Sequence, residues 1–157
     1  MRTIYTIWDS ATAILSGRIA ESIAQLAARV ALGMMFWRSY GTKVVEGTWF
    51  NIDETQYFIF ENEFTGLPLS PDIAVPLTTF AEFAFPLLLF AGLATRFSAA
   101  ALMVMALVIQ IFVFPTWDHF LGWDITVLAL GAFLVSRGGG LFALDALLGR
   151  LRPARTP

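Results

Sequence analysis

The chain has 157 residues and a formal net charge of −2, with 57 % hydrophobic and only 14 % charged residues. Soluble domains carry about a quarter charged residues, so this composition excludes an ordinary soluble protein and predicts a polytopic membrane protein with one domain, residues 1–157. The absence of cysteine excludes disulfides, thiol redox chemistry and iron–sulfur clusters. The single histidine, His119, excludes a haem held by two histidines of one chain, and no basic patch indicates nucleic acid as a partner.

Four stretches of the chain are long and apolar enough to cross a bilayer as helices. This pattern predicts an all-α fold, a bundle of four transmembrane helices. A long loop on the outer side of the membrane is expected to connect the first two helices. The expected spans cover about residues 22–45, 73–94, 97–114 and 120–135.

Amphipathic surface helices are expected at both termini. Near the N-terminus, the apolar residues from Ile4 to Ile19 recur at close to helical spacing, which favours a helix on the membrane surface over a frayed tail. The leucines between Leu141 and Leu151 repeat in the same way, and the basic residues around them can bind anionic lipid headgroups. These basic residues are Arg150, Arg152 and Arg155.

The connection over residues 46–72 is both acidic and aromatic. It contains six acidic residues, no lysine or arginine, and six aromatic residues of the kind that gather at membrane interfaces. Its run Asp53–Phe64 is predicted to form a short helix. The acidic residues lack the spacing of a calcium-binding EF-hand, which favours a solvated acidic face over a metal site.

The distribution of charge predicts the orientation of the chain. With the N-terminus in the cytoplasm, the inner side carries seven arginines, whereas the outer side carries at most Lys43 and the acidic connection. Both termini are therefore expected to be cytoplasmic, because positive charge is enriched on the inner side of membrane proteins. The seven arginines are Arg2, Arg18, Arg96, Arg137, Arg150, Arg152 and Arg155.

One carboxylate, Glu82, lies close to the middle of the second span, where an unpaired charge is costly. Pro86 cannot donate a hydrogen bond to the carbonyl of Glu82, which predicts a kink there. Glu82 is expected to pair with a deep arginine of the first span, with Arg38 in preference to Arg29 because Arg38 lies closer in depth. A protonated Glu82 that only holds neighbouring helices together is the alternative.

Other polar side chains fall at similar depths in the outer half of the bundle. A rise of about 1.5 Å per residue places Gln110 and Asp124 on the order of 5 Å below the outer surface, and His119 and Lys43 at its rim. These groups predict a buried polar pocket that opens outward, with two structural ion pairs between helices as the alternative. The candidate pocket residues are Glu82, Arg38, Arg29, Lys43, Gln110, Asp124 and His119.

The sequence shows no phosphate loop, no zinc-binding histidine pair and no nucleophile elbow, so neither a catalytic residue nor a metal site is predicted. The order of its motifs, over roughly residues 22–150, resembles the DoxX family. Ala143 stands where that family usually has serine. The motifs are Arg29-x-x-x-Gly33-x-x-Phe36, Gly41-x-Lys43, Glu82 with Pro86 and the leucines after it, Gly92-Leu93-Ala94-Thr95-Arg96, and Arg137-Gly138-Gly139-Gly140-Leu141-x-x-Leu144-Asp145.

This resemblance implies a four-helix, multi-pass protein of the bacterial inner membrane, in a family linked to quinone-coupled sulfur oxidation and to oxidative-stress complexes. The expected function is that of a membrane subunit that works with a protein partner, or as a homo-oligomer, in a quinone-linked redox or oxidative-stress complex. A quinone is the candidate ligand, and no haem or iron–sulfur signature is present. Two alternatives remain open: a small-solute transporter or export accessory, and a non-catalytic anchor that recruits a soluble partner.

Overall fold

A computed structural model describes residue 12 and residues 16–151, so most of the predicted N-terminal surface helix and the last six residues lie outside the described part. The described chain is helical and contains no strand, and four of its helical segments are long and apolar enough to cross a membrane. The prediction of an all-α, four-span fold is therefore confirmed. The four segments are α2 (Arg18–Gly41), α4 (Pro71–Ala91), α5 (Thr95–Phe112), and the run of α6 (Trp117–His119), the π-helix η1 (Phe120–Asp124) and α7 (Ile125–Arg137).

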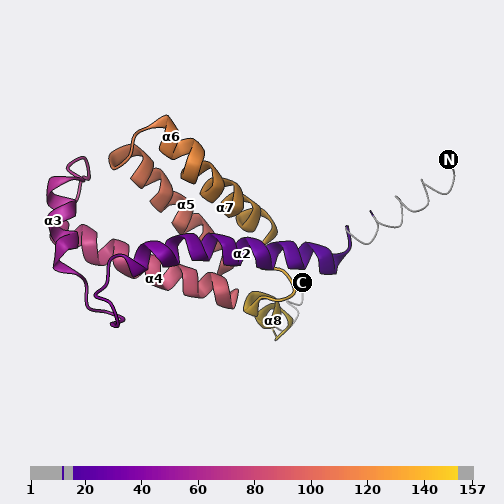
Figure 1. Ribbon diagram of the computed structural model, residues 1–157. Helices are drawn as coiled ribbons and strands as arrows, with labels where there is room; N and C mark the ends of the chain where they lie inside the picture. The colour runs from indigo at the N-terminus through magenta and orange to yellow at the C-terminus, as the bar shows by residue number, and fades with distance from the viewer. Residues whose placement is uncertain (1–11, 13–15, 152–157) are drawn as a thin grey trace, which may run out of the picture.

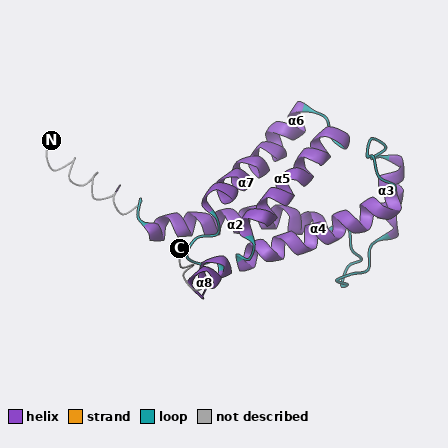
Figure 2. Cartoon of the chain, turned by 180° about the vertical axis from the view of Figure 1, so that it is seen from behind, coloured by secondary structure: helices purple, strands orange, loops and turns teal. Residues whose placement is uncertain are grey.

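The four spans form two pairs. In Figure 1, α2 and α4 lie side by side and antiparallel, and α5 and α7 form a second pair that crosses the first obliquely. The view from behind shows the same two pairs (Figure 2). Helix α3 (Glu54–Asn62) and α6 mark one end of the bundle, here named the α3 end, and α8 (Leu144–Leu151) marks the other, the α8 end.

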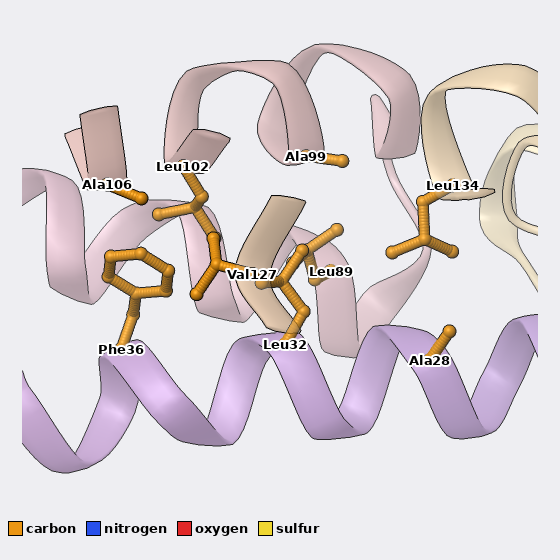
Figure 3. Close-up of a cluster of buried hydrophobic side chains, with 9 residues drawn as sticks. All are labelled: Ala28, Leu32, Phe36, Leu89, Ala99, Leu102, Ala106, Val127 and Leu134. Atoms are coloured by element: carbon orange, nitrogen blue, oxygen red, sulfur yellow. The ribbon is translucent and has the colours of Figure 1, made fainter. Parts of the chain in front are cut away.

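The core lies where the two pairs of helices cross, and one side of it is formed by α2. Figure 3 shows Ala28, Leu32 and Phe36 at helical spacing along α2, pointing toward the other three spans. Small residues on α5 allow its backbone to approach the neighbouring helices closely. The buried cluster is completed by Leu89 of α4, by Ala99, Leu102 and Ala106 of α5, and by Val127 and Leu134 of α7.

The outer faces of the spans carry many large apolar side chains. Phe80 of α4, and Val104 and Ile111 of α5, are among the large apolar side chains exposed on the surface of the chain. In water, apolar faces of this extent would be unfavourable, whereas a bilayer solvates them. The fold thus buries polar groups inside and presents hydrocarbon outside, as a membrane protein requires.

The long connection between α2 and α4 is partly ordered by helix α3. The predicted helix Asp53–Phe64 is confirmed, since α3 spans Glu54–Asn62 and begins after Asp53, whose carboxylate accepts a hydrogen bond from the backbone N–H of Thr55 at 2.9 Å. Phe60 of α3 packs with Ala74 and Val75 of α4 in a second buried cluster. The connection is therefore held against the start of α4.

We expect the cap of α3 to depend on the ionisation of Asp53. Hydrogen bonds from Thr55 lower the pKa of Asp53, so the cap stabilises the folded state above the unfolded pKa of about 3.9 and this stabilisation is lost as the pH falls through the lower folded pKa. Asp53→Ala should reduce the amide-exchange protection factors of α3 at neutral pH, and acid should have the same effect on the unmodified protein. Unchanged protection of α3 in Asp53→Ala would contradict the cap.

Candidate functional site

A buried ion pair joins Lys43, just beyond the end of α2, to Glu82 in the middle of α4. The Lys43 Nζ lies 2.8 Å from Glu82 Oε2 and 3.1 Å from Oε1. Ser39 completes the group, since its hydroxyl donates to Glu82 Oε1 at 3.1 Å and accepts from Lys43 Nζ at 3.0 Å. Glu82 is only 2 % exposed. The bonds that Lys43 makes to Ser39 and to the two oxygens of Glu82 use all three of its N–H groups.

The predicted pairing of Glu82 with Arg38 or Arg29 is therefore wrong. Arg38 is exposed on the outer face of α2, whereas Lys43 follows Ser39 by four residues and so lies on the same side of the chain as Ser39. Lys43 was also expected at the outer rim. Its long aliphatic stem instead carries the ammonium group inward to the level of Glu82.

An aromatic groove lies between α2, the connection and α4, close to this ion pair. It is a pocket of about 110 Å³ whose wall includes Tyr40 and Thr79, which lie one helical turn from Lys43 and Glu82 respectively. The hydroxyl of Tyr40 donates to the carbonyl of Trp49, which ties the connection to α2. The lining residues are Tyr40, Trp49, Phe50, Ile52, Pro76, Thr79, Phe80 and Phe83.

A second polar cluster lies at the α3 end, between α5, α6 and η1. His119 Nδ1 lies 2.6 Å from Asp124 Oδ2 and 3.1 Å from Gln110 Oε1. Gln110 is itself oriented, because its Nε2 donates to the carbonyl of Thr116 at 3.1 Å. The imidazole contacts the rings of Phe114 and Trp123, with centroid distances of 4.9 and 5.6 Å. This cluster, His119–Asp124–Gln110, is named the histidine cluster below.

The local backbone explains how a polar cluster forms beside a hydrophobic helix. Residues Phe120–Asp124 form one turn of π-helix, a distortion that often occurs at functional sites. Asp124 is 0 % exposed, and its Oδ1 has no hydrogen-bond partner in the described part of the chain. A buried carboxylate oxygen without a hydrogen-bond partner lowers the stability of the fold. The position of Asp124 beside His119 is therefore not explained by stability.

An open pocket of about 210 Å³ borders the histidine cluster. Two of its lining residues, Gln110 and Thr116, are hydrogen-bonded to His119, the first through the ring and the second through the backbone N–H of His119 at 3.3 Å. Trp117 and Phe120 supply aromatic walls, and their ring centroids lie 5.5 Å apart. With Pro115, these residues form the lining, which is named the interfacial pocket below.

The third predicted cation, Arg29, belongs to neither cluster. It is 0 % exposed and donates to the carbonyls of Leu89 at 3.3 Å and Phe142 at 3.0 Å, toward the α8 end. Gly92 leaves space for the guanidinium group, because a side-chain carbon at this position would lie 1.9 Å from Arg29 Nη1. The backbone of Gly92 is also left-handed, at φ +68°, which favours glycine. Arg29 thus joins α2 to the chain beyond α7 by contacts with backbone carbonyls.

Asp145 closes the same end of the bundle. Its carboxylate accepts hydrogen bonds from the backbone N–H groups of Ala94 and Thr95, each at 2.8 Å, at the start of α5. These N–H groups have no partner within the helix, and the helix N-terminus attracts negative charge. Asp145 therefore caps a helix from about fifty residues away along the chain, the larger of the two sequence separations being 51.

A family model for DoxX matches residues 24–115, more than half of the chain. The chain belongs to the DoxX family. With its four apolar helices, this DoxX protein is a multi-pass membrane protein whose outer surface contacts the lipid bilayer. A search of curated proteins and a search of solved structures each found no match.

The structure divides the predicted polar pocket of this DoxX protein into separate groups. Lys43 and Glu82 form one, Gln110, His119 and Asp124 form another, and Arg29 and Arg38 belong to neither. Among the described residues, no three His, Asp or Glu side chains gather closely enough to hold a metal ion. Sequence reasoning missed Ser39, although its position four residues before Lys43 was a usable signal.

Proposed function

We propose that this DoxX protein is a subunit of a quinone-linked redox or oxidative-stress complex, in which it binds the quinone ring and works with a partner protein. The observation that carries the proposal is the interfacial pocket, which has aromatic walls and a polar side formed by Gln110 and Thr116. Quinone rings are flat and apolar with oxygens at opposite edges, so they suit a pocket that offers both stacking and hydrogen bonds.

A partner is part of the proposal because of what the sequence lacks. Electrons that enter or leave a quinone need a second redox group, and this chain has no cysteine and one histidine with which to hold an iron–sulfur cluster or haem. The second group is therefore assigned to another protein of the complex. The exposed apolar faces of the spans keep the subunit in the same bilayer as the hydrophobic quinone.

Binding of a short-tailed quinone, decylubiquinone, to the protein in lipid nanodiscs tests this function by calorimetry. Saturable binding is expected, and Gln110→Leu should weaken it about tenfold, equivalent to about 1.4 kcal/mol, because one hydrogen-bonding side of the pocket is removed. Phe80→Leu, in the aromatic groove between α2 and α4, is the matched control and should leave the affinity unchanged. The absence of saturable binding to the unmodified protein would refute the function.

We also propose that the protein lies in the bacterial inner membrane with both termini in the cytoplasm, as the charge asymmetry favours. Cysteines placed at Thr55, exposed in α3, and at Gly149, exposed in α8, should then react differently with an impermeant thiol reagent in spheroplasts. Both sites tolerate the change, since Thr55 is exposed and nothing lies within 4 Å of a side-chain carbon at Gly149. Position 55 should label and position 149 should label only after lysis; the reverse pattern would overturn the orientation.

A further inference from the structure

Three exposed arginines from separate helices gather at the α8 end of the bundle. A side-chain carbon at Gly138 would lie 3.4 Å from Arg96 Nε, so Arg96 lies beside the turn that follows Arg137. The start of α8 is held at the same place, because Asp145 accepts a hydrogen bond from the backbone N–H of Thr95. The three residues, named the arginine surface below, are Arg96 in the first turn of α5, Arg137 at the end of α7 and Arg150 in the last turn of α8.

Little negative charge in the described part of the chain offsets the arginine surface. No described carboxylate lies within ion-pair distance of Arg96 or Arg150. Arg137 pairs with Glu21 at 3.3 Å, but their side chains are 63 % and 41 % exposed, and ion pairs in contact with solvent are weak. The carboxylate of Asp145 already accepts two backbone hydrogen bonds at the start of α5. The arginine surface therefore keeps an excess of positive charge that an external anion can neutralise.

Helix α8 places an apolar face beside these arginines. Its four leucines recur at helical spacing, and each is between 44 % and 71 % exposed. Eight residues are too few to cross a bilayer, and Figure 1 shows α8 beyond the end of α4. A short helix with a leucine face and a basic residue is typical of a helix that lies along a membrane surface. The leucines are Leu144, Leu147, Leu148 and Leu151.

From these observations we propose that the α8 end binds anionic phospholipids, with α8 lying in the headgroup region of one leaflet. The leucines of α8 enter the acyl chains, and the arginine surface binds the phosphate groups. A guanidinium group suits a phosphate because its N–H groups can donate to two phosphate oxygens at once. The occupant is a lipid, because a free phosphate ion would leave the apolar face beside the arginines uncovered. This inference does not depend on the proposed function.

Native mass spectrometry of the protein in a non-ionic detergent tests the proposal. Phosphatidylglycerol and phosphatidylcholine with identical acyl chains are compared, and we expect the first to bind at least fivefold more tightly, about the factor that one arginine contributes near an anionic surface. Equal affinities would overturn the proposal. Inorganic phosphate, compared with chloride at the same ionic strength, should not displace the bound lipid. Displacement would mean that the arginines take a free phosphate, and would also overturn the proposal.

Two variants then locate the preference. Arg96→Gln combined with Arg150→Gln removes two of the three cations, neither of which has an ion-pair partner among the described residues, and should lower the preference below twofold. Arg38→Gln is the matched control, since Arg38 is an exposed arginine near the other end of α2, and it should keep the fivefold preference. An unchanged preference in the double variant, or an equal loss in Arg38→Gln, would contradict the role of the arginine surface.

A fluorescence measurement distinguishes lipid from a protein partner or a second copy of the chain on the leucine face. Because the chain has no cysteine, Leu147→Cys can carry a single bimane label. In nanodiscs that contain phosphatidylglycerol with brominated acyl chains, this label should be quenched, as should a label at Val104→Cys on the exposed apolar face of α5. A label at Glu61→Cys, exposed in α3, gives the unquenched reference. Quenching at position 147 no stronger than at position 61 would mean that protein or water covers the leucines, and would overturn the proposal.

Discussion

Replacing Glu82 with glutamine should lower the free energy of unfolding by about 3–5 kcal/mol, the usual cost of leaving one partner of a buried ion pair alone. Glu82 is buried and bonds both Lys43 and Ser39, so the neutral amide would leave the ammonium group of Lys43 without a counter-charge inside the bundle. Thermal unfolding in detergent measures the loss. Glu61→Gln changes the same charge at an exposed position and should shift the melting temperature little.

The double replacement Lys43→Met with Glu82→Leu shows what the pair contributes. Removing both charges leaves no unpaired buried charge, so most of the stability lost in Glu82→Gln should return, less the cost of the two bonds that the hydroxyl of Ser39 loses. Quinone binding should also be preserved, because the interfacial pocket includes neither residue. If Glu82→Gln were as stable as the unmodified protein, the ion pair would not be needed for folding. If the double variant were stable but no longer bound the quinone, Glu82 would belong to the ligand site.

Asp145→Ala should also destabilise the protein, by about 1–3 kcal/mol, the usual cost of losing a helix cap together with a negative charge at the helix N-terminus. The change leaves two backbone N–H groups at the start of α5 without acceptors and removes a negative charge from the helix N-terminus. Asp145→Asn keeps one acceptor oxygen, so its melting temperature should lie between those of Asp145→Ala and the unmodified protein. Asp72→Ala is the matched control, since Asp72 is an exposed acidic residue in the first turn of α4, and it should cost only about 0.3–1 kcal/mol.

Equal melting temperatures for Asp145→Ala and Asp72→Ala would contradict the long-range cap. Amide exchange at the start of α5 gives a local check on the same point. The amide of Thr95 should lose protection in Asp145→Ala, whereas amides in the middle of α5 should change only through the loss of overall stability.

The four spans and the short helix in the connection could be predicted because hydropathy and helical period are local signals. The partner of Glu82 could not be chosen by depth alone. Arg38 is nine residues from Arg29, which places the two arginines on opposite faces of α2, so the burial of Arg29 implies the exposure of Arg38. The preference for Arg38 rested on depth alone, and the depth estimate ignored the length of the lysine side chain.

The histidine cluster and the cap by Asp145 show two other limits of the sequence. His119 and Asp124 are five residues apart, a spacing that places them on one side only because the chain turns into a π-helix there. Asp145 meets α5 only because the glycine-rich segment after α7 turns back under the bundle, with left-handed Gly138 and Gly140. Neither the π-helix nor the turn after α7 produces a periodic pattern in the sequence from which it could be predicted.

The contact between Arg29 and Phe142 also sets an order of events during synthesis. The two residues are 113 positions apart, so at a rate of roughly 5–20 residues per second the arginine waits on the order of 6–20 s for this acceptor, whereas its other acceptor, the carbonyl of Leu89, is made earlier. Through that time the guanidinium group of the first span lacks one of the two carbonyls that it bonds in the finished bundle. Synthesis of the segment around Phe142 therefore decides when the first helix reaches its final contacts, and a chain cut short before Phe142 would expose the unfinished state to quality control.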